Sequence, residues 1–246
     1  PTVGATESGI PTSLTTASGE EITFELFKSP SKDVTLRILW IAPSFGVDPR
    51  HQQTAEALAK QGAEVWLVDL AEALFLTKGA TSMRAIPAQL LAELINALID
   101  FDGKHTELVV VSNSYGAIPA IRGIHAWQSQ QTKSVGLIGA ILFSPSFFSH
   151  VPELGVEPDF IPELAATNVP IYIFQAANNG NRWHLPAVLD TLKNTTVYAE
   201  LLKDVRSVFH RRDTSPSSLK SFENAPRMIL QAVKQLRQHS VPLTPL

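Results

Sequence analysis

The sequence predicts an α/β protein with a mostly parallel, twisted sheet of about eight strands and helices on both faces. Short aliphatic runs alternate along the chain with segments of helical length and helical hydrophobic spacing. Several of the aliphatic runs are apolar at nearly every position, which is typical of strands that are covered on both faces. Strands that alternate with helices pair in parallel through right-handed crossovers.

The N-terminal region is expected to differ from the rest. Residues 1–18 are rich in Thr, Ser, Gly, Ala and Pro, a composition typical of a flexible tail. A β-hairpin is predicted next, with Leu14–Thr16 and the alternating run Glu21–Phe27 on either side of a turn. No second domain or internal repeat is evident, so residues 19–246 are expected to form one domain.

The remaining elements follow in strand-and-helix order. Apolar runs predict six strands: Leu36–Ala42, Glu64–Leu70, Leu108–Val111, Leu137–Phe143, Val169–Phe174 and Thr195–Leu202. Helical spacing of apolar residues, as at Leu91, Leu94 and Leu98, and a glycine such as Gly62 after a helix mark the helical segments. These predicted helices are Gln52–Gln61, Ala88–Phe101, Tyr115–Gln128, Leu185–Lys193 and Ser217–Gln238.

Composition excludes several classes of function. Hydrophobic residues make up 44% and charged residues 17% of the 246 residues, which argues against a disordered chain. A net charge of -3 without a basic block argues against a nucleic-acid or anionic-membrane surface and favours a neutral small molecule as the partner. The absence of cysteine excludes disulfides, thiolate metal sites and a cysteine nucleophile. Apolar stretches such as Gly136–Phe143 are too short for a membrane span.

The tail also bears on the compartment. A spacer of this composition often follows a cleaved signal or a lipid-anchored N-terminus, and Pro1 in place of Met is consistent with such processing. We therefore expect a periplasmic or cell-envelope location, with a lipid anchor ahead of Pro1. The alternative is a cytoplasmic protein with an arbitrary boundary here.

A motif with chemical meaning follows the strand that ends at Val111. The chain reads Ser112-Asn113-Ser114-Tyr115-Gly116 between this strand and a predicted helix. A sharp strand-to-helix turn exposes a nucleophilic serine and requires small residues two before and two after it, as Ser112 and Gly116 are. The alternative is that Ser114 merely caps a helix.

With this motif, the sequence from Ser13 to Gln238 resembles the α/β-hydrolase superfamily. The resemblance implies that Ser114 is the nucleophile. It also implies that the loop Pro43-Ser44-Phe45-Gly46 replaces the usual His-Gly-aromatic sequence, so that the Phe45 and Tyr115 N–H groups form the oxyanion hole.

The resemblance also implies a catalytic histidine after the last strand, where His210 lies between that strand and the closing helix. Its role is to take the proton from Ser114 and return it to the leaving group. His184 and His150 are rival candidates in loops at the same edge of the sheet. The other histidines are interpreted as solvated helix or loop residues: His51, His105, His125 and His239.

The third triad member is not a carboxylate at its usual place. The loop after the seventh strand offers Asn178 and Asn179, and an amide oxygen of Asn179 orients an imidazole without stabilising its charge. Carboxylates from elsewhere are expected to compensate, so that one lies within hydrogen-bond reach of His210. The candidates are Glu153, Glu157 and Asp159 in the loop after the sixth strand, or Asp213.

The connection after Phe143 is too short for a lid domain, so only a minimal lid and an open site are expected. Phe147, Phe148 and Trp183 offer an apolar wall for an acyl or aromatic group, unless the two phenylalanines pack on the sheet edge. No histidine pair has the spacing of a metal site and no phosphate-binding loop occurs, so no cofactor is expected.

These observations favour a serine hydrolase that cleaves a carboxylic ester or thioester of a small acyl substrate through an acyl-enzyme on Ser114. The alternative is a hydrolase-fold protein that has lost catalysis and serves as a binding or scaffolding module.

Overall fold

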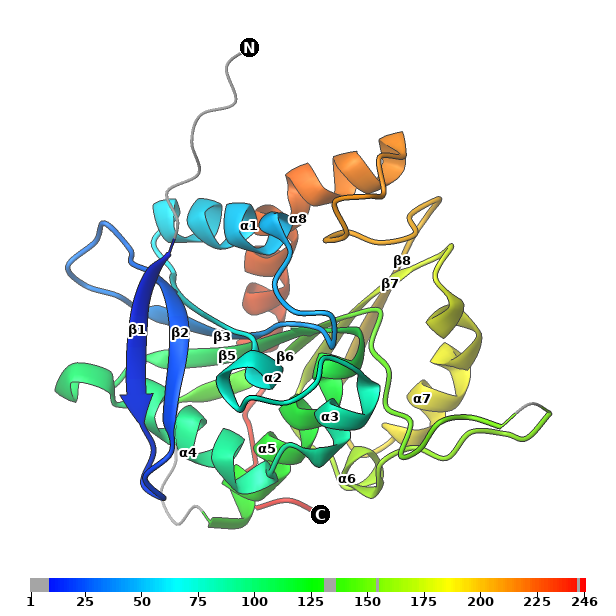
Figure 1. Ribbon diagram of the computed structural model, residues 1–246, viewed down its shortest axis with the longest axis horizontal. Coiled ribbons are helices and arrows are strands. Elements are labelled where there is room, and N and C mark those ends of the chain that lie inside the picture. The colour runs from blue at the N-terminus through cyan, green and yellow to red at the C-terminus, as the bar shows by residue number, and fades with distance from the viewer. Residues whose placement is uncertain (1–8, 131–135, 154, 243) are drawn as a thin grey trace.

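The computed structural model describes residues 9–130, 136–153, 155–242 and 244–246 (Figure 1). Its centre is one eight-stranded sheet with the order β1-β2-β4-β3-β5-β6-β7-β8. The strands are β1 (Ile10–Thr15), β2 (Glu21–Phe27), β3 (Leu36–Ile41), β4 (Glu64–Val68), β5 (Glu107–Asn113), β6 (Leu137–Phe143), β7 (Ile171–Ala176) and β8 (Val197–Leu202).

The sheet is parallel from β4 to β8, and only β1 and β2 run antiparallel to their neighbours. β5 lies between β3 and β6 and is parallel to both. The predicted α/β class and the mostly parallel sheet are therefore confirmed. The first predicted hairpin pairs β1 with β2, and Leu14 faces Ile22 across it.

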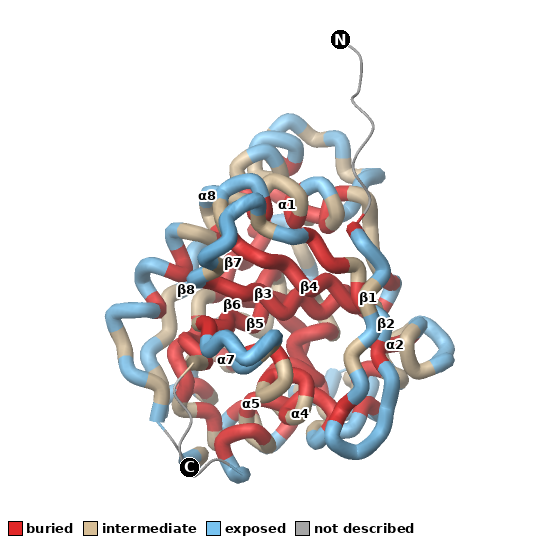
Figure 2. The backbone as a smooth tube through the Cα atoms, turned by 90° about the vertical axis from the view of Figure 1, so that its left-hand side faces the viewer, coloured by how far each residue is buried: buried red, intermediate tan, exposed pale blue. Residues whose placement is uncertain are grey.

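Helices cover both faces of the sheet. On one face lie α1 (Pro49–Lys60) and the closing helix α8 (Pro216–Leu236), whose apolar residues share a core with β3, β5 and β6. On the other face the two longest helices are α4 (Ala88–Ile99) and α5 (Ala117–Gln130). Figure 2 shows the buried strands as a layer between these two groups of helices. The shorter helices are α2 (Leu70–Ala73), α3 (Ala80–Ala85), α6 (Pro162–Ala165), α7 (Leu185–Thr191) and the 3₁₀ turns η1 (Phe101–Gly103), η2 (Ser114–Gly116) and η3 (Gly180–His184).

The predicted N-terminal tail of residues 1–18 is wrong for Ile10–Thr15. Residues 1–8 lie outside the described residues, but Ile10–Thr15 is a strand rather than part of a flexible segment. Ile10, Thr12 and Leu14 lie opposite apolar residues of β2, and this pairing orders a segment whose composition is typical of a tail.

The connection between β6 and β7 carries only the short helix α6 among its described residues. No helix in the described part of the chain has the length and apolar character that crossing a membrane requires.

Candidate active site

Ser114 lies at the carboxyl end of the central strand β5, at the turn into α5. Its φ of 48° is in the left-handed region, which residues other than glycine rarely adopt. The Ser114 hydroxyl makes no hydrogen bond within the described residues, and the residue that caps η2 is Asn113, so Ser114 is not a helix cap. The turn presents a free hydroxyl at the edge of the sheet where ligands of α/β proteins bind.

Gly116 explains why this turn needs a small residue two positions after the serine. A Cβ atom at Gly116 would lie 2.9 Å from the Ala42 carbonyl oxygen and 3.2 Å from that of Ile41. β3 and the start of α5 therefore approach so closely that no larger residue fits without a shift of the backbone. Ser112, two positions before Ser114, is fully buried.

A cavity of about 550 Å³ opens beside Ser114 and is of the size of a small-ligand site. Its walls come from the loop after β3, the end of β5, the end of β6, the loop after β7 and the segment between β8 and α8. Of the residues expected from the sequence, Phe45, Ser114, Asn179 and His210 all line it. Segments distant in sequence meet here because the carboxyl ends of parallel strands share one edge.

The two backbone N–H groups expected to form the oxyanion hole belong to Phe45, which lines the cavity with Ser114, and to Tyr115, which follows Ser114 in the chain. The turn Pro43–Gly46 is closed by a 2.8 Å hydrogen bond from the Gly46 N–H to the Pro43 carbonyl. The Phe45 side chain is 79% exposed at the mouth of the cavity. Within the described residues, neither the Phe45 nor the Tyr115 N–H is used in a hydrogen bond. The Tyr115 side chain turns away from the cavity and packs near Phe148 and under the Arg84 guanidinium.

The His210 ring is exposed on the segment between β8 and α8. Its Nδ1 accepts a hydrogen bond from the Arg212 N–H at 3.2 Å, and its own backbone N–H donates to Ser207 Oγ. A nitrogen that accepts an N–H carries no proton, so the neutral ring has its proton on Nε2. In this arrangement Nε2 is a donor rather than a base.

No carboxylate reaches His210 in the described structure, so the expected compensating acid is a wrong prediction. Asp213 is occupied elsewhere: its carboxylate accepts hydrogen bonds from Ser207 N, from Ser215 N and Oγ, and from Ser218 Oγ at 2.6 Å. Neither Glu153, Glu157 nor Asp159 lines the cavity. The backbone carbonyl oxygens of Glu153 and Asp159 close turns of their own loop.

The asparagines after β7 are structural as they stand. The Asn178 N–H donates to the Val205 carbonyl. Asn179 Oδ1 caps η3 by accepting the Asn181 N–H at 2.9 Å, and its Nδ2 donates to the Arg206 carbonyl. The amide oxygen proposed to orient His210 is therefore used for a turn.

Several residues that line the cavity are missing from the sequence prediction, among them Asp48, His51 and Ser144. Asp48 caps α1, with Oδ1 accepting the Arg50 N–H and Oδ2 the Arg211 N–H. Ser144 follows β6 with a φ of 42°, and its Oγ accepts the Ala176 N–H at 3.1 Å. The Asp48-Pro49 pair, an N-cap followed by proline, was the available signal for an earlier start of α1.

His51 is buried, contrary to its interpretation as a solvated residue. It is 1% exposed, stacks on Phe209 at 5.0 Å and meets Trp40 edge-on. Burial lowers the pKa of His51 to about 4, although Asp48 acts in the opposite direction. His51 Nδ1 accepts the Asp48 N–H at 2.9 Å, so this ring is also neutral with its proton on Nε2.

The rival residues lie outside this cavity. His150 bonds to Ser149, and His184 packs edge-on against Phe148. Phe147 is fully buried and Phe148 stacks on Phe160, so both pack into the protein as in the alternative interpretation. Trp183 is 73% exposed and lies under the Arg182 guanidinium.

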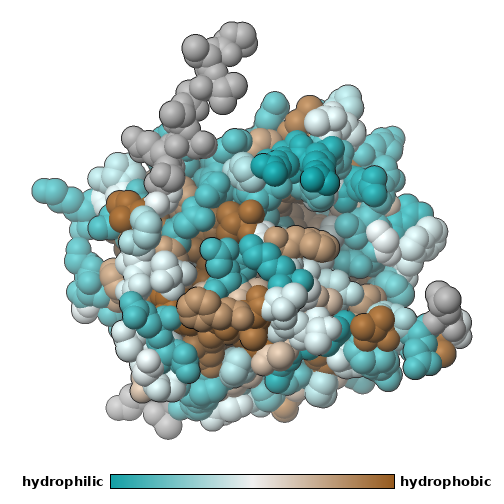
Figure 3. All heavy atoms as spheres, in the orientation of Figure 1, coloured by the Kyte–Doolittle hydropathy of each residue, from teal (hydrophilic) through white to brown (hydrophobic). Residues whose placement is uncertain are grey.

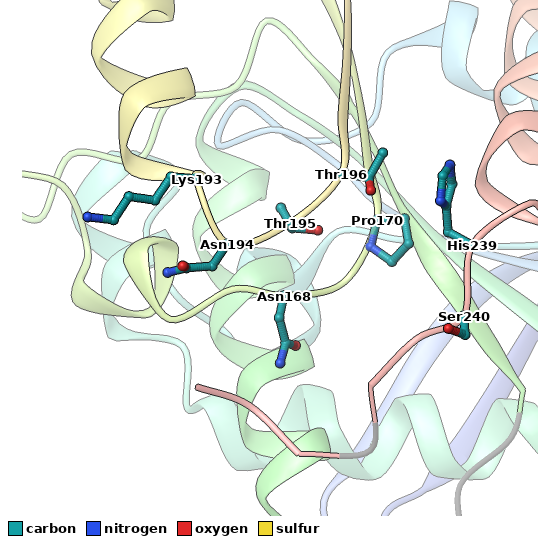
Figure 4. A pocket seen from close by; sticks show the side chains of 8 residues that line it. All are labelled: Asn168, Pro170, Lys193, Asn194, Thr195, Thr196, His239 and Ser240. Carbon is teal, nitrogen blue, oxygen red and sulfur yellow. The ribbon is translucent and has the colours of Figure 1, made fainter.

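A second depression of about 400 Å³ lies at the opposite edge of the sheet, near the starts of β7 and β8 (Figure 4). Its wall is polar and includes Asn168, Thr195 and His239, and Lys193 points away from the other labelled side chains. His239 Nε2 is paired with the Tyr198 hydroxyl at 2.7 Å. The edge that carries Ser114 is the better candidate for an active site.

Solved structures share this fold. A protein assigned as a dienelactone hydrolase from Klebsiella pneumoniae matches with a TM-score of 0.66 and 13% identity, over 92% of this chain and 98% of that one. The esterase domain of a Rhodothermus marinus protein matches with a TM-score of 0.60 and 10% identity, over 91% and 98% of the two chains. Esterase 2 of Thermogutta terrifontis, phosphorylated by paraoxon, matches with a TM-score of 0.56 and 11% identity, over 92% and 95%.

These likenesses show that the chain has the α/β-hydrolase fold. No family model matches the sequence, and a search of curated proteins gives no match either.

Proposed function

We propose that this α/β-hydrolase-fold protein is a serine hydrolase that cleaves a carboxylic ester or thioester through an acyl-enzyme on Ser114. The observation that carries the proposal is Ser114 itself: a free hydroxyl on a left-handed turn at the end of the central strand, facing a cavity of about 550 Å³. Esterases and a protein assigned as a dienelactone hydrolase with the same fold support the reaction class.

The proposed reaction proceeds in two acyl transfers. Ser114 Oγ attacks the carbonyl carbon while His210 Nε2 takes the hydroxyl proton, and the Phe45 and Tyr115 N–H groups hold the resulting oxyanion. Collapse breaks the bond to the alcohol or thiol, which leaves with the proton from His210. Water then attacks the acyl-enzyme by the same steps and releases the acid.

This mechanism requires His210 to change its hydrogen bonds. Nε2 accepts a proton only when Nδ1 carries one, so Nδ1 must exchange the Arg212 N–H for an acceptor. The amide oxygen of Asn179 is the acceptor that we propose, once it leaves the Asn181 N–H. Catalytic hydrogen bonds of this kind often form only in the complex with substrate.

A fluorophosphonate probe tests the nucleophile. The probe should label the wild-type protein, and Ser114→Ala should abolish labelling without changing the melting temperature by more than a few degrees. Ser144→Ala is the matched control, because Ser144 lines the same cavity on a similar left-handed turn but its Oγ is already hydrogen-bonded. Labelling that survives in Ser114→Ala and disappears in Ser144→Ala would assign the nucleophile to Ser144.

The second candidate function is a binding or scaffolding module, favoured by the lack of a carboxylate at His210 among the described contacts. Two measurements separate the candidates: turnover of 4-nitrophenyl esters of short and long acids, and the effect of His210→Ala. For a hydrolase, His210→Ala should slow turnover by about 100-fold or more. Wild-type protein that neither turns over any ester nor reacts with the probe would favour the binding module.

A further inference from the structure

Three arginines line the cavity beside Ser114: Arg206, Arg211 and Arg212. All three side chains are exposed, and none makes an ion pair or a side-chain hydrogen bond within the described residues. In Figure 3 strongly hydrophilic side chains gather over the segment between β8 and α8, beside a hollow in that face. The cavity therefore has a cationic rim on the side of His210.

Most other arginines in the described residues have a partner for the guanidinium group, and Arg50, Arg84 and Arg182 donate theirs to backbone carbonyls. The chain has 23 Asp and Glu against 20 Lys and Arg, and elsewhere Arg37, Arg122 and Arg237 each pair with a glutamate. At the cavity the one carboxylate among the lining residues is Asp48. Its oxygens accept backbone N–H groups, and Asp213 beyond the rim does the same with serines. The carboxylates of Asp48 and Asp213 therefore accept hydrogen bonds from the backbone and from serines, and neither forms an ion pair with the three arginines.

The segment that carries the arginines is firmly anchored. The buried Arg50 donates to the Val208 and Asp213 carbonyls, and the Phe209 ring packs edge-on against Trp40 and Phe143. The arginines therefore extend from a fixed backbone at the mouth of the cavity. Guanidinium groups match carboxylates in planar, paired hydrogen bonds, and several of them at a cleft raise the local concentration of anions.

Apolar side chains face the same cavity. Phe45, Val47 and Phe143 line it together with the arginines. This combination fits a ligand with a short hydrocarbon chain and one charged end.

We propose that the substrate is an acyl ester that carries a carboxylate on the acyl group, away from the bond that is cleaved, and that Arg206, Arg211 and Arg212 bind this carboxylate. This inference rests on the proposed hydrolase function and replaces the neutral partner expected from the net charge of the whole chain. The arginines act as specificity residues because they contact the charged end and take no part in bond breaking.

The test compares two esters that differ only in this charge: the 4-nitrophenyl monoester of adipic acid and its methyl ester at the other end. We expect wild-type kcat/KM to be at least tenfold higher for the charged ester, and to fall with added sodium chloride for this ester alone. Arg211→Gln combined with Arg212→Gln should lower kcat/KM far more for the charged ester than for the methyl ester, so that the ratio of the two values falls to about one. Arg227→Gln, an exposed arginine of α8 outside the cavity, is the matched control.

The outcomes separate this inference from the hydrolase proposal. Equal kcat/KM for the two esters, or an equal loss on both in the double variant, would overturn the carboxylate site and leave the hydrolase intact. If the protein cleaves neither these esters nor the 4-nitrophenyl esters above and does not react with the fluorophosphonate probe, the hydrolase proposal fails. Titration of the protein with adipate then decides the site: binding that disappears in the double variant supports it, and no binding overturns it.

Discussion

His51 makes the stability of the protein depend on pH. Its pKa is lowered from 6.5 to about 4 by burial, so between these pH values the unfolded chain binds a proton that the folded chain does not. The stabilisation is complete above about pH 6.5 and is lost as the pH falls toward 4. Between pH 6.5 and pH 4 and below, this shift lowers the free energy of unfolding by an amount on the order of 3 kcal/mol.

We expect His51→Phe, which keeps a ring against Phe209, to lose less stability than the wild type between pH 7 and pH 4. Urea unfolding at several pH values measures the difference. Parallel curves for the two proteins would contradict a buried neutral histidine.

The sequence predicts the site residues that are placed by the order of strands and helices, and not those that are placed by contacts between distant segments. Ser114 and His210 were predicted to share a site, and both line the cavity, because Ser114 directly follows β5 and His210 lies in the segment between β8 and α8. His51 was misinterpreted because the predicted helix began at Gln52, whereas α1 begins at Pro49 and places His51 in its first turn against Trp40. The compensating acid was wrong because hydrogen bonds from serines already occupy the Asp213 carboxylate. Such three-dimensional competition for an acceptor leaves no periodic pattern.

At the scale of elements, Asp213 holds the segment between β8 and α8 in place. Burial by itself would raise the pKa of Asp213, but hydrogen bonds from Ser218, Ser215 and Ser207 outweigh it and hold the pKa below its usual value. We expect Asp213→Asn to destabilise the protein by about 1–3 kcal/mol, because an amide turns a donor toward donors. The contribution should be present above about pH 4 and be lost as the pH falls through the lowered pKa.

Chemical unfolding and hydrogen exchange of residues 205–212 measure this effect. Asp204→Asn is the control, since Asp204 lies in the preceding turn, is exposed and adopts a φ of 58° that asparagine tolerates. Equal stability of the two variants would show that Asp213 does not fix the segment.

Long elements were predicted better than short ones. β6 was predicted with its observed bounds because seven buried residues in succession leave no competing pattern. The short helices α2, α3 and α6 were not predicted, since four to six residues carry too little periodicity and depend on tertiary contacts. β1 was missed for most of its length because its exposed face is made of residues typical of a tail.

At the scale of the whole molecule, we expect the carboxyl ends of the parallel strands to carry the reaction and their amino ends to stabilise the fold. The alternation of strands and helices predicted the parallel sheet, and a parallel sheet brings the loops after β3, β5, β7 and β8 to one edge. The sequence could not predict which side chains of those loops meet, because loop conformation is set by hydrogen bonds such as those of Arg50 and Asp48 between distant segments. At the amino ends of the strands, where β3 and β4 begin, we expect side-chain contacts to stabilise the fold and to take no part in the reaction.

Arg37 and Glu64 test this division. Arg37 Nε donates to Glu64 Oε1 at 3.0 Å, linking neighbouring strands. The guanidinium also donates to the Leu98 carbonyl in the last turn of α4 and to the Phe101 and Lys104 carbonyls after it. Both side chains are nearly buried, so Arg37→Met leaves a buried carboxylate without its cation and should destabilise the protein by about 3–5 kcal/mol. Adding Glu64→Gln should restore part of that loss, because the unpaired charge disappears. The rate of fluorophosphonate labelling at Ser114 should stay within twofold of the wild type at temperatures where the variants are folded, whereas a large loss of labelling in folded protein would show that the two edges are coupled.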